Sequence, residues 1–247
     1  GEEAVYLQAL CEAEQYVAWR LTEMSRGELV APHGLDELID RIQNDQGIVY
    51  APQQREAVAL AATSQVMLLT GGPGTGKTTS LRGVLALFDQ LGLETALAAP
   101  TGRAAKRMTE VTGREAKTIH RLLEVEPFQE SLTFKRNEKN PLPADAVIVD
   151  EMSMVDVLIM ESLFRGLRLG AKLILVGDSD QLPSVAAGNV LGDLMASGLV
   201  PTVHLDQVFR QAAESLIVVN AHAIVKGELP DLGRKDGDFF FLPRRDP

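Results

Sequence analysis

Residues 71–80 read Gly-Gly-Pro-Gly-Thr-Gly-Lys-Thr-Thr-Ser and follow the apolar run Val66–Thr70. The spacing Gly71-x-x-x-x-Gly76-Lys77-Thr78 is the complete P-loop pattern, in the strand-before and helix-after context that supports it. Glycines let backbone N–H groups turn inward on phosphates, and the helix N-terminus adds a positive dipole. We therefore predict an ATP site whose contacts are Gly72, Pro73, Gly74, Thr75, Gly76, Lys77, Thr78 and Thr79.

A second apolar run, Ala146–Val149, ends in Asp150 and Glu151. A P-loop needs a carboxylate at the end of a neighbouring strand to hold its metal ion, and α/β folds place ligands at the carboxyl ends of strands. Lys77 is predicted to reach the β- and γ-phosphates, and Thr78 and Asp150 to hold Mg²⁺. Glu151 is predicted to take a proton from the attacking water.

A third predicted strand, Lys172–Val176, is followed by Gly177-Asp178-Ser-Asp180-Gln181. An uncharged amide at such a strand end can hydrogen-bond both the γ-phosphate and the water. Gln181 is therefore a candidate catalytic residue, and a simple polar turn is the alternative interpretation.

Short apolar runs alternate with helical patterns from residue 51 onward. This alternation predicts an α/β fold with a parallel sheet covered by helices on both faces. The expected strands are 66–70, 95–99, 146–149, 172–176 and 202–205. The expected helices are 3–26, 35–43, 52–62, 77–91, 102–112, 155–167, 189–196 and 212–226.

Composition and charge narrow the class of protein. The chain has 247 residues, a net charge of −10 and one cysteine, Cys11, so neither an internal disulfide nor a cysteine zinc cluster is expected. Cytoplasmic location is expected, and no apolar run reaches the roughly 20 residues that span a bilayer. Residues 1–50 are acidic, whereas residues 101–121 carry six basic and two acidic side chains. This basic strip is either a phosphate-gripping surface or a solvated helix face.

The order of the motifs GGPGTGKTT, APTGRAAKRM, TIHRLL, VIVDEMSM, GDSDQLPSVAAGNVL and LDQVFRQ resembles superfamily 1 DNA helicases of the RecD type. That family includes the alpha subunit of exodeoxyribonuclease V and stand-alone relatives. The resemblance covers about residues 50–230. It implies a RecA-like motor domain that hydrolyses ATP to move on single-stranded DNA with 5′-to-3′ polarity, in DNA repair and recombination.

The resemblance also assigns residues at the nucleotide. Gln54 matches the amide that reads adenine, and Gln53 is its rival. Arg210 matches an arginine that reaches the γ-phosphate.

Two further segments match the DNA-facing parts of the family. The implied DNA contacts are Pro100, Thr101, Arg103, Lys106, Thr118 and His120. Residues 126–143 lie where the family inserts a small hairpin that splits the duplex, and a surface loop is the alternative. On that hypothesis Lys135, Arg136 and Lys139 lie near the hairpin tip.

The family pattern implies a division of the chain. Residues 1–50 are expected to be an N-terminal helical segment of a larger domain, 51–205 the first motor domain, and 206–247 the start of a connection to a second motor domain. The expected partners are single-stranded DNA or a single-strand/duplex junction, the second motor domain, and nuclease or helicase subunits, with no membrane. Alone, the chain is expected to bind Mg-ATP weakly and to unwind no duplex.

Two other functions stay open on sequence grounds. One is a catalytically silent module that binds single-stranded DNA or a protein. The other is a P-loop ATPase that acts on RNA or protein. Three histidines without partners at metal-ligand spacing, His33, His204 and His222, are interpreted as structural.

Overall fold

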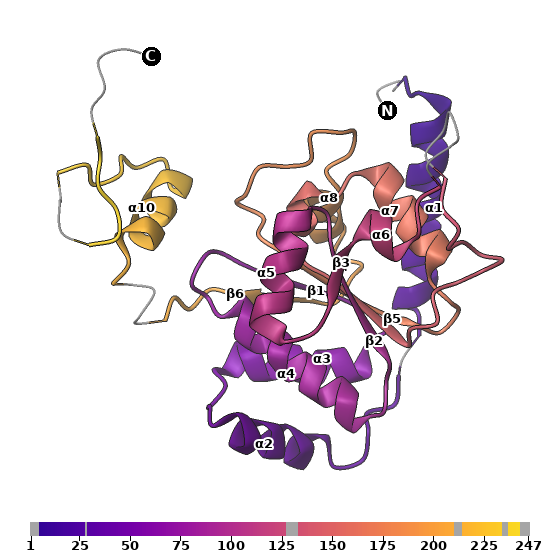
Figure 1. Ribbon diagram of the computed structural model, residues 1–247, viewed down its shortest axis with the longest axis horizontal. Coiled ribbons are helices and arrows are strands. Elements are labelled where there is room, and N and C mark those ends of the chain that lie inside the picture. Colours follow the sequence, from indigo (N-terminus) through magenta and orange to yellow (C-terminus); the bar gives the residue numbers. More distant parts are fainter. Residues whose placement is uncertain (1–4, 28, 127–132, 210–213, 234–236, 243–247) are drawn as a thin grey trace.

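The computed structural model describes residues 5–27, 29–126, 133–209, 214–233 and 237–242. Within them a six-stranded sheet has the order β3-β2-β4-β5-β1-β6, and every strand pair is parallel (Figure 1). The strands are β1 (Val66–Gly71), β2 (Thr95–Ala99), β3 (Ala116–Thr118), β4 (Ala146–Val149), β5 (Lys172–Gly177) and β6 (Thr202–Leu205). The predicted α/β class with a parallel sheet is confirmed.

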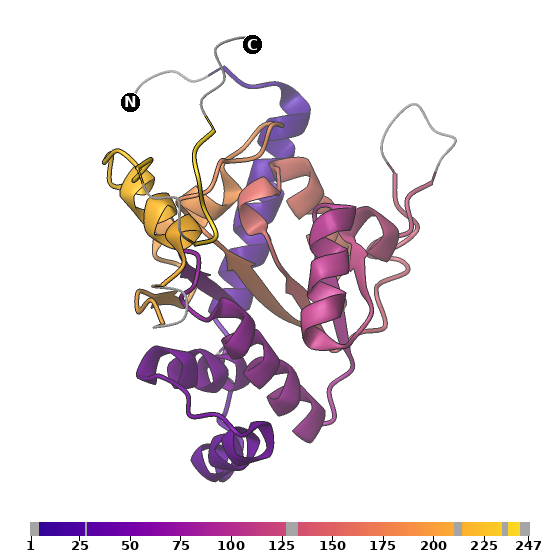
Figure 2. The ribbon, with the colours of Figure 1, turned by 60° about the vertical axis from the view of Figure 1, so that its left-hand side comes forward.

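Helices cover both faces of this sheet, as the turned view in Figure 2 shows. One face packs against α3 (Pro52–Thr63), α4 (Lys77–Gln90) and α5 (Gly102–Thr112), and α2 (Leu35–Gln46) packs on the outer side of α3 and α4 (Figure 1). The other packs against α1 (Gln8–Ser25), α6 (Ile119–Leu122), α7 (Val157–Gly166) and α8 (Val190–Ser197). In the described part of the chain, no helix combines the length and apolar character needed to cross a membrane.

Strand β1 shows why the sheet needs helices on both sides. Val66 and Leu68 pack into the core on one face, and Met67 and Leu69 pack into the core on the other. Successive side chains of a strand point to opposite faces, so an uninterrupted apolar run buries both. The sequence places β1 inside the sheet, and it pairs with β5 on one side and β6 on the other.

Several boundaries differ from the sequence-based expectations. Helix α1 begins at Gln8 rather than residue 3, and the last helix, α10, spans Leu216–Val225. The short strand β3 and the one-turn helix α6 were not predicted, because three and four residues are too few to show a period. A 3₁₀ turn, η1 (Met152–Met154), precedes α7, which is capped by Asp156 through a 2.9 Å hydrogen bond from the Ile159 N–H.

The inserted segment leaves the domain between α6 and β4. Its arms pair through an antiparallel bridge between Val125 and Phe134, and residues 127–132 lie outside the described part. Arg136 lies at the base of this segment, not near a tip, because its guanidinium pairs with Glu124 at 2.7 Å. Duplex splitting by residues 126–143 stays a prediction.

Gly83 on α4 offers a test of how tightly the helical layer packs. A Cβ at this position would lie 2.6 Å from the Tyr50 hydroxyl and 2.7 Å from Val58 Cγ2. Alanine is the better helix former by about 1 kcal/mol, but overpacking a core costs about 1–3 kcal/mol. We expect Gly83→Ala to lower the free energy of unfolding in urea.

Gly102, the first residue of α5, is the matched control, because a Cβ there meets no atom within 4 Å. Gly102→Ala should leave the stability unchanged or raise it. Equal effects of the two substitutions would contradict the packing described for Gly83.

Candidate nucleotide-binding and hydrolysis site

The loop between β1 and α4 has the backbone conformation that its glycines allow. Gly74 and Gly76 lie in the left-handed region, at φ of +76° and +88°. The Thr75 hydroxyl donates to the Gly72 carbonyl at 2.9 Å, which fixes the turn from inside. The Lys77 ammonium donates to the carbonyls of Gly71 and Gly72, so it is folded back onto the loop.

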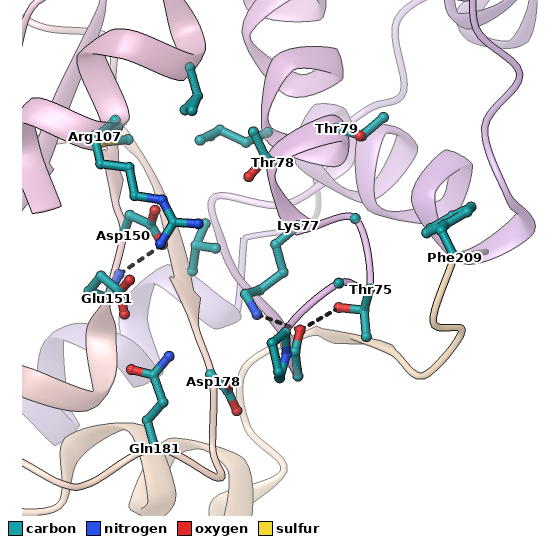
Figure 3. A pocket seen from close by; sticks show the side chains of 18 of the residues that line it. Thr75, Lys77, Thr78, Thr79, Arg107, Asp150, Glu151, Asp178, Gln181 and Phe209 are labelled. Carbon is teal, nitrogen blue, oxygen red and sulfur yellow. Dashed lines mark hydrogen bonds between the residues drawn. The ribbon is translucent and has the colours of Figure 1, made fainter. Parts of the chain in front are cut away.

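This loop forms one wall of a cavity of about 770 Å³ (Figure 3). The cavity joins the P-loop to residues that follow other strands and to side chains of helices. Its lining includes Gly72, Pro73, Gly74, Thr75, Gly76, Lys77, Thr78, Thr79, Arg107, Asp150, Glu151, Asp178, Gln181 and Phe209. The structure thus brings together every predicted P-loop contact, both predicted carboxylates and Gln181.

Asp150 and Glu151 stand at the carboxyl end of β4. The Glu151 N–H donates to Asp150 Oδ1 at 2.8 Å, and Glu151 adopts a left-handed backbone with φ of 57°. Such a conformation costs a non-glycine residue about 1–3 kcal/mol and persists only where its surroundings hold it. The turn thereby lets two consecutive carboxylates line the same cavity.

Burial sets the protonation tendencies of this cavity. It raises the pKa of both Asp150 and Glu151 and lowers the pKa of Lys77. The charges partly offset burial, since Lys77 lowers the pKa of both carboxyl groups and Asp178 raises the pKa of Lys77. Partly buried groups of opposite sign, whose charged forms are disfavoured by burial, are typical of a site that binds a charged ligand.

Strand β5 delivers the remaining polar groups. Asp178 is buried after the strand, and its Oδ1 accepts a 3.0 Å hydrogen bond from the Asp180 N–H. The Gln181 N–H donates to the Asp178 carbonyl at 3.3 Å, and the exposed Gln181 side chain lines the cavity. An amide on a short loop anchored by a buried aspartate is able to move with its ligand.

Gln54 occupies a different place from that expected of an adenine reader. It is buried, its Oε1 accepts from the Ala51 N–H at 3.0 Å, and its Nε2 donates to the Gly76 carbonyl at 3.4 Å. Both ends of the amide are therefore engaged, and Gln54 is absent from the lining of the cavity as the described residues define it. Gln53 is partly exposed, and the adenine role of either residue stays a prediction.

The predicted DNA contacts gather at the carboxyl ends of β2 and β3. These strands are neighbours with Ala99 paired to Thr118, so residues 100–101 and 118–120 emerge side by side. Thr101 and Thr118 cap α5 and α6, accepting from the N–H groups of Ala104 and Arg121, both at 3.2 Å.

The other side chains of this group surround the caps. Arg103 and Lys106 are exposed on α5, and the His120 ring lies 5.9 Å from the Phe134 ring at the base of the insertion. Pro100 follows β2 directly. The group forms one rim beside the cavity, and its DNA role stays a prediction.

Three residues differ from the sequence-based expectations, one that is not described and two that were not predicted. Arg210 lies outside the described residues. Sequence reasoning missed Arg107, which it counted only within the basic strip, and Phe209, whose N–H donates to the Gly74 carbonyl at 3.2 Å. The sequence offers no signal for Arg107, because Arg103, Lys106 and Arg107 are all exposed on α5 and only the fold shows which of them lines the cavity.

Comparisons with known proteins agree with this geometry. Residues 54–187 match the family described as AAA domain. The ATP-dependent RecD2 DNA helicase of Deinococcus radiodurans is 40% identical over 242 residues, which are 95% of this chain and 32% of that protein. The RecBCD enzyme subunit RecD of Mycobacterium tuberculosis is 44% identical over 166 residues, covering 58% of this chain and 28% of that protein.

The chain therefore spans about a third of the length of the curated relatives it matches. Among solved structures, the Pif1 helicase from Candida albicans is similar with a TM-score of 0.54 and 25% identity, covering 74% of this chain and 46% of that one. The resemblance to the RecD type that the motifs indicated is confirmed by these relatives.

The position of Gln54 predicts a structural cost for its removal. Gln54→Ala would leave the Ala51 N–H and the Gly76 carbonyl without this partner, at about 1–2 kcal/mol. We expect a lower free energy of unfolding in urea for Gln54→Ala. The control Gln53→Ala, one residue away on the same helix, should stay within about 0.5 kcal/mol of the wild type. Equal stability of the two variants would contradict the anchoring role.

Proposed function

The chain belongs to the AAA domain family that its residues 54–187 match, and on this premise we propose that it is an ATP-hydrolysing motor domain of a RecD-type DNA helicase. The motor domain is assigned to residues 51–205, preceded by an N-terminal helical segment at 1–50. Residues 206–247 are assigned to the start of a connection to a second motor domain. The relative named as an ATP-dependent DNA helicase supports this function.

One observation carries the proposal. Lys77, the Asp150–Glu151 pair and Gln181 come from segments far apart in the sequence, yet they line one cavity. A phosphate-binding loop without hydrolytic carboxylates would suit a silent binding module. The presence of the phosphate-binding loop and the two carboxylates in one cavity favours an ATPase. The neighbouring rim of predicted DNA contacts favours DNA as the polymer on which it moves.

The cavity fits Mg²⁺ by the chemistry of its donors. Thr78 and Asp150 both line it and offer a hydroxyl and a carboxylate, the hard oxygen ligands that this ion prefers. When bound, Mg²⁺ neutralises charge on the β- and γ-phosphates. The ammonium of Lys77 would exchange its present carbonyl partners for phosphate oxygens, which restores the charged form that burial disfavours.

Hydrolysis then needs a base and a means of orienting water. The water oxygen forms a bond to the γ-phosphorus, the bond to the β–γ bridging oxygen breaks, and Glu151 accepts the proton. Gln181 orients the water and contacts the γ-phosphate. Because Gln181 belongs to a loop next to the buried Asp178, its contact reports the state of the nucleotide to the domain.

The direction of movement and the assembly are finer proposals. Family resemblance supports 5′-to-3′ movement on single-stranded DNA, and one relative is named as a subunit of the RecBCD enzyme. We assign the same setting to the longer protein: a second motor domain that closes the cavity, with nuclease or helicase subunits as partners.

The catalytic assignment is tested by Glu151→Gln in the full-length protein. The substitution keeps the shape of the side chain and removes the base, so ATP hydrolysis stimulated by single-stranded DNA should fall about 10²–10⁴-fold. Binding of ATP, measured by calorimetry, should stay within a few-fold of the wild type. A silent binding module would show no DNA-stimulated phosphate release in either protein.

The DNA rim is tested by the double variant Arg103→Ala/Lys106→Ala. Removing two phosphate contacts should weaken binding of single-stranded DNA and reduce the slope of log affinity against log salt by about 1.4. A charge-matched control is the double variant Arg26→Ala/Arg41→Ala. Arg26 directly follows α1, and Arg41 lies on α2. Arg26 pairs with Glu23 as Lys106 pairs with Glu110, so each double variant breaks one surface ion pair.

The control should bind DNA like the wild type. An ATPase that acts on protein predicts no change in either variant and no stimulation by DNA. Equal stimulation by RNA of the same sequence would assign the motor to both nucleic acids.

A further inference from the structure

We propose that Arg107 binds the terminal phosphate of ATP and thereby ties the triphosphate directly to α5, the helix that carries predicted DNA contacts. This inference rests on the proposed ATPase function and adds a residue to its phosphate-binding set. Its basis is the place of Arg107 within the cavity and its lack of any other partner in the described structure.

Arg107 reaches the cavity from the side opposite the P-loop. Figure 3 shows its guanidinium extending from α5 toward Asp150, while Lys77 rises from the loop across the cavity. Two cations on opposite walls leave room for a polyanion between them. A guanidinium presents five N–H donors in a planar fork, which suits the oxygens of a phosphate group.

The other basic residues of this region help to single out Arg107. Lys106 pairs with Glu110 at 3.9 Å, Lys117 with Glu115 at 3.8 Å, and Arg114 with Asp89. Within the described ranges, Arg107 has no hydrogen bond and no carboxylate within ion-pairing distance. Arg103 and Arg121 are also unpaired by that measure in the described residues, but neither lines the cavity.

The charges around the cavity explain why a second cation is needed. Asp150, Glu151 and Asp178 line it, and their charges repel a triphosphate. Arg107 lines the same cavity and carries the opposite charge. Arg107 thus already offsets the carboxylates electrostatically, at a distance that leaves its N–H donors unused.

The same placement identifies which phosphate Arg107 meets. In the proposed function residues 72–79 hold the inner phosphates, and the carboxylates at the end of β4, which line the same cavity, face the bond that breaks. Arg107 lies on the carboxylate side, so it contacts the γ-phosphate and has no equivalent group to bind in ADP. Discrimination between ATP and ADP is therefore the signature of this residue.

A consequence for coupling follows from the helix itself. Arg103 and Lys106 are exposed on α5, and Arg107 is the next residue after Lys106. An α-helix moves as a rigid body over these few residues. Loss of the γ-phosphate therefore removes the contact of Arg107 from the same helix that carries the predicted contacts with single-stranded DNA. Gln181 would then be one of two sensors and not the sole one.

The experiment measures nucleotide affinity in the full-length protein with Mg²⁺. Arg107→Ala and Arg107→Gln should bind a non-hydrolysable ATP analogue 10–100-fold more weakly than the wild type, a loss in the range of charge-assisted hydrogen bonds. Affinity for ADP should stay within about threefold. Arg107→Lys should recover part of the loss, because it keeps the charge but not the planar fork.

The control is Arg41→Ala, which removes an exposed arginine from α2, outside the cavity lining. It should leave both affinities unchanged, and thermal unfolding should show all variants folded. Unchanged analogue binding in Arg107→Ala, or equal losses for analogue and ADP, would overturn the inference while leaving the ATPase function intact. If the wild type binds neither nucleotide, the proposed function fails and this inference fails with it.

Discussion

The register of the central strands is the constraint on which the whole site depends. Thr70 of β1 pairs with Gly177 of β5, and Val149 of β4 pairs with Leu175 of β5. This alignment lets the P-loop, the Asp150–Glu151 pair and the Asp178 turn leave the sheet at one edge. A slip of one residue would turn every side chain of a strand to the opposite face. The apolar residues that β1 buries on both faces therefore also keep the catalytic groups aligned.

The cavity that results holds charged side chains whose ionised forms are disfavoured by burial. Burial raises the pKa of Asp150 and Glu151 on one side and lowers the pKa of Lys77 on the other. The Lys77 ammonium donates hydrogen bonds to carbonyls of its own loop. In the proposed function a Mg-triphosphate would supply partners for both at once, a cation for the carboxylates and phosphate oxygens for the lysine. Binding therefore relieves penalties that folding imposed. The left-handed backbone of Glu151 belongs to the same pattern, since strain held by the fold positions a group for chemistry.

Much of this arrangement could be predicted from the sequence, for physical reasons. The strands β1, β4 and β5 are short apolar runs that stop at polar residues, so each predicted both a strand and a functional edge. Gln54 shows the limit, because a motif identifies a residue type but not which of two adjacent glutamines turns inward on α3. Arg107 shows another, since charge counting along the chain does not say which exposed basic side chain of a helix lines a cavity. The strand β3 escaped because three half-buried residues carry no usable period.

The strand order β3-β2-β4-β5-β1-β6 also suggests how the parts of a motor are laid out along one edge. The predicted DNA contacts follow β2 and β3 at one end, and the proposed hydrolytic residues follow β4, β5 and β1 in the middle. Phe209 and α10 come after β6 at the other end, where Phe209 contacts Gly74 and His222 lies 3.2 Å from the Pro73 carbonyl. The nucleotide cavity thus has the predicted DNA contacts on one side and the segment after β6 on the other. Strand β6 is the immediate neighbour of β1, whereas β5 and β4 lie between β1 and β2, so a change at the P-loop reaches the segment after β6 directly and α5 through the residues that follow β5 and β4.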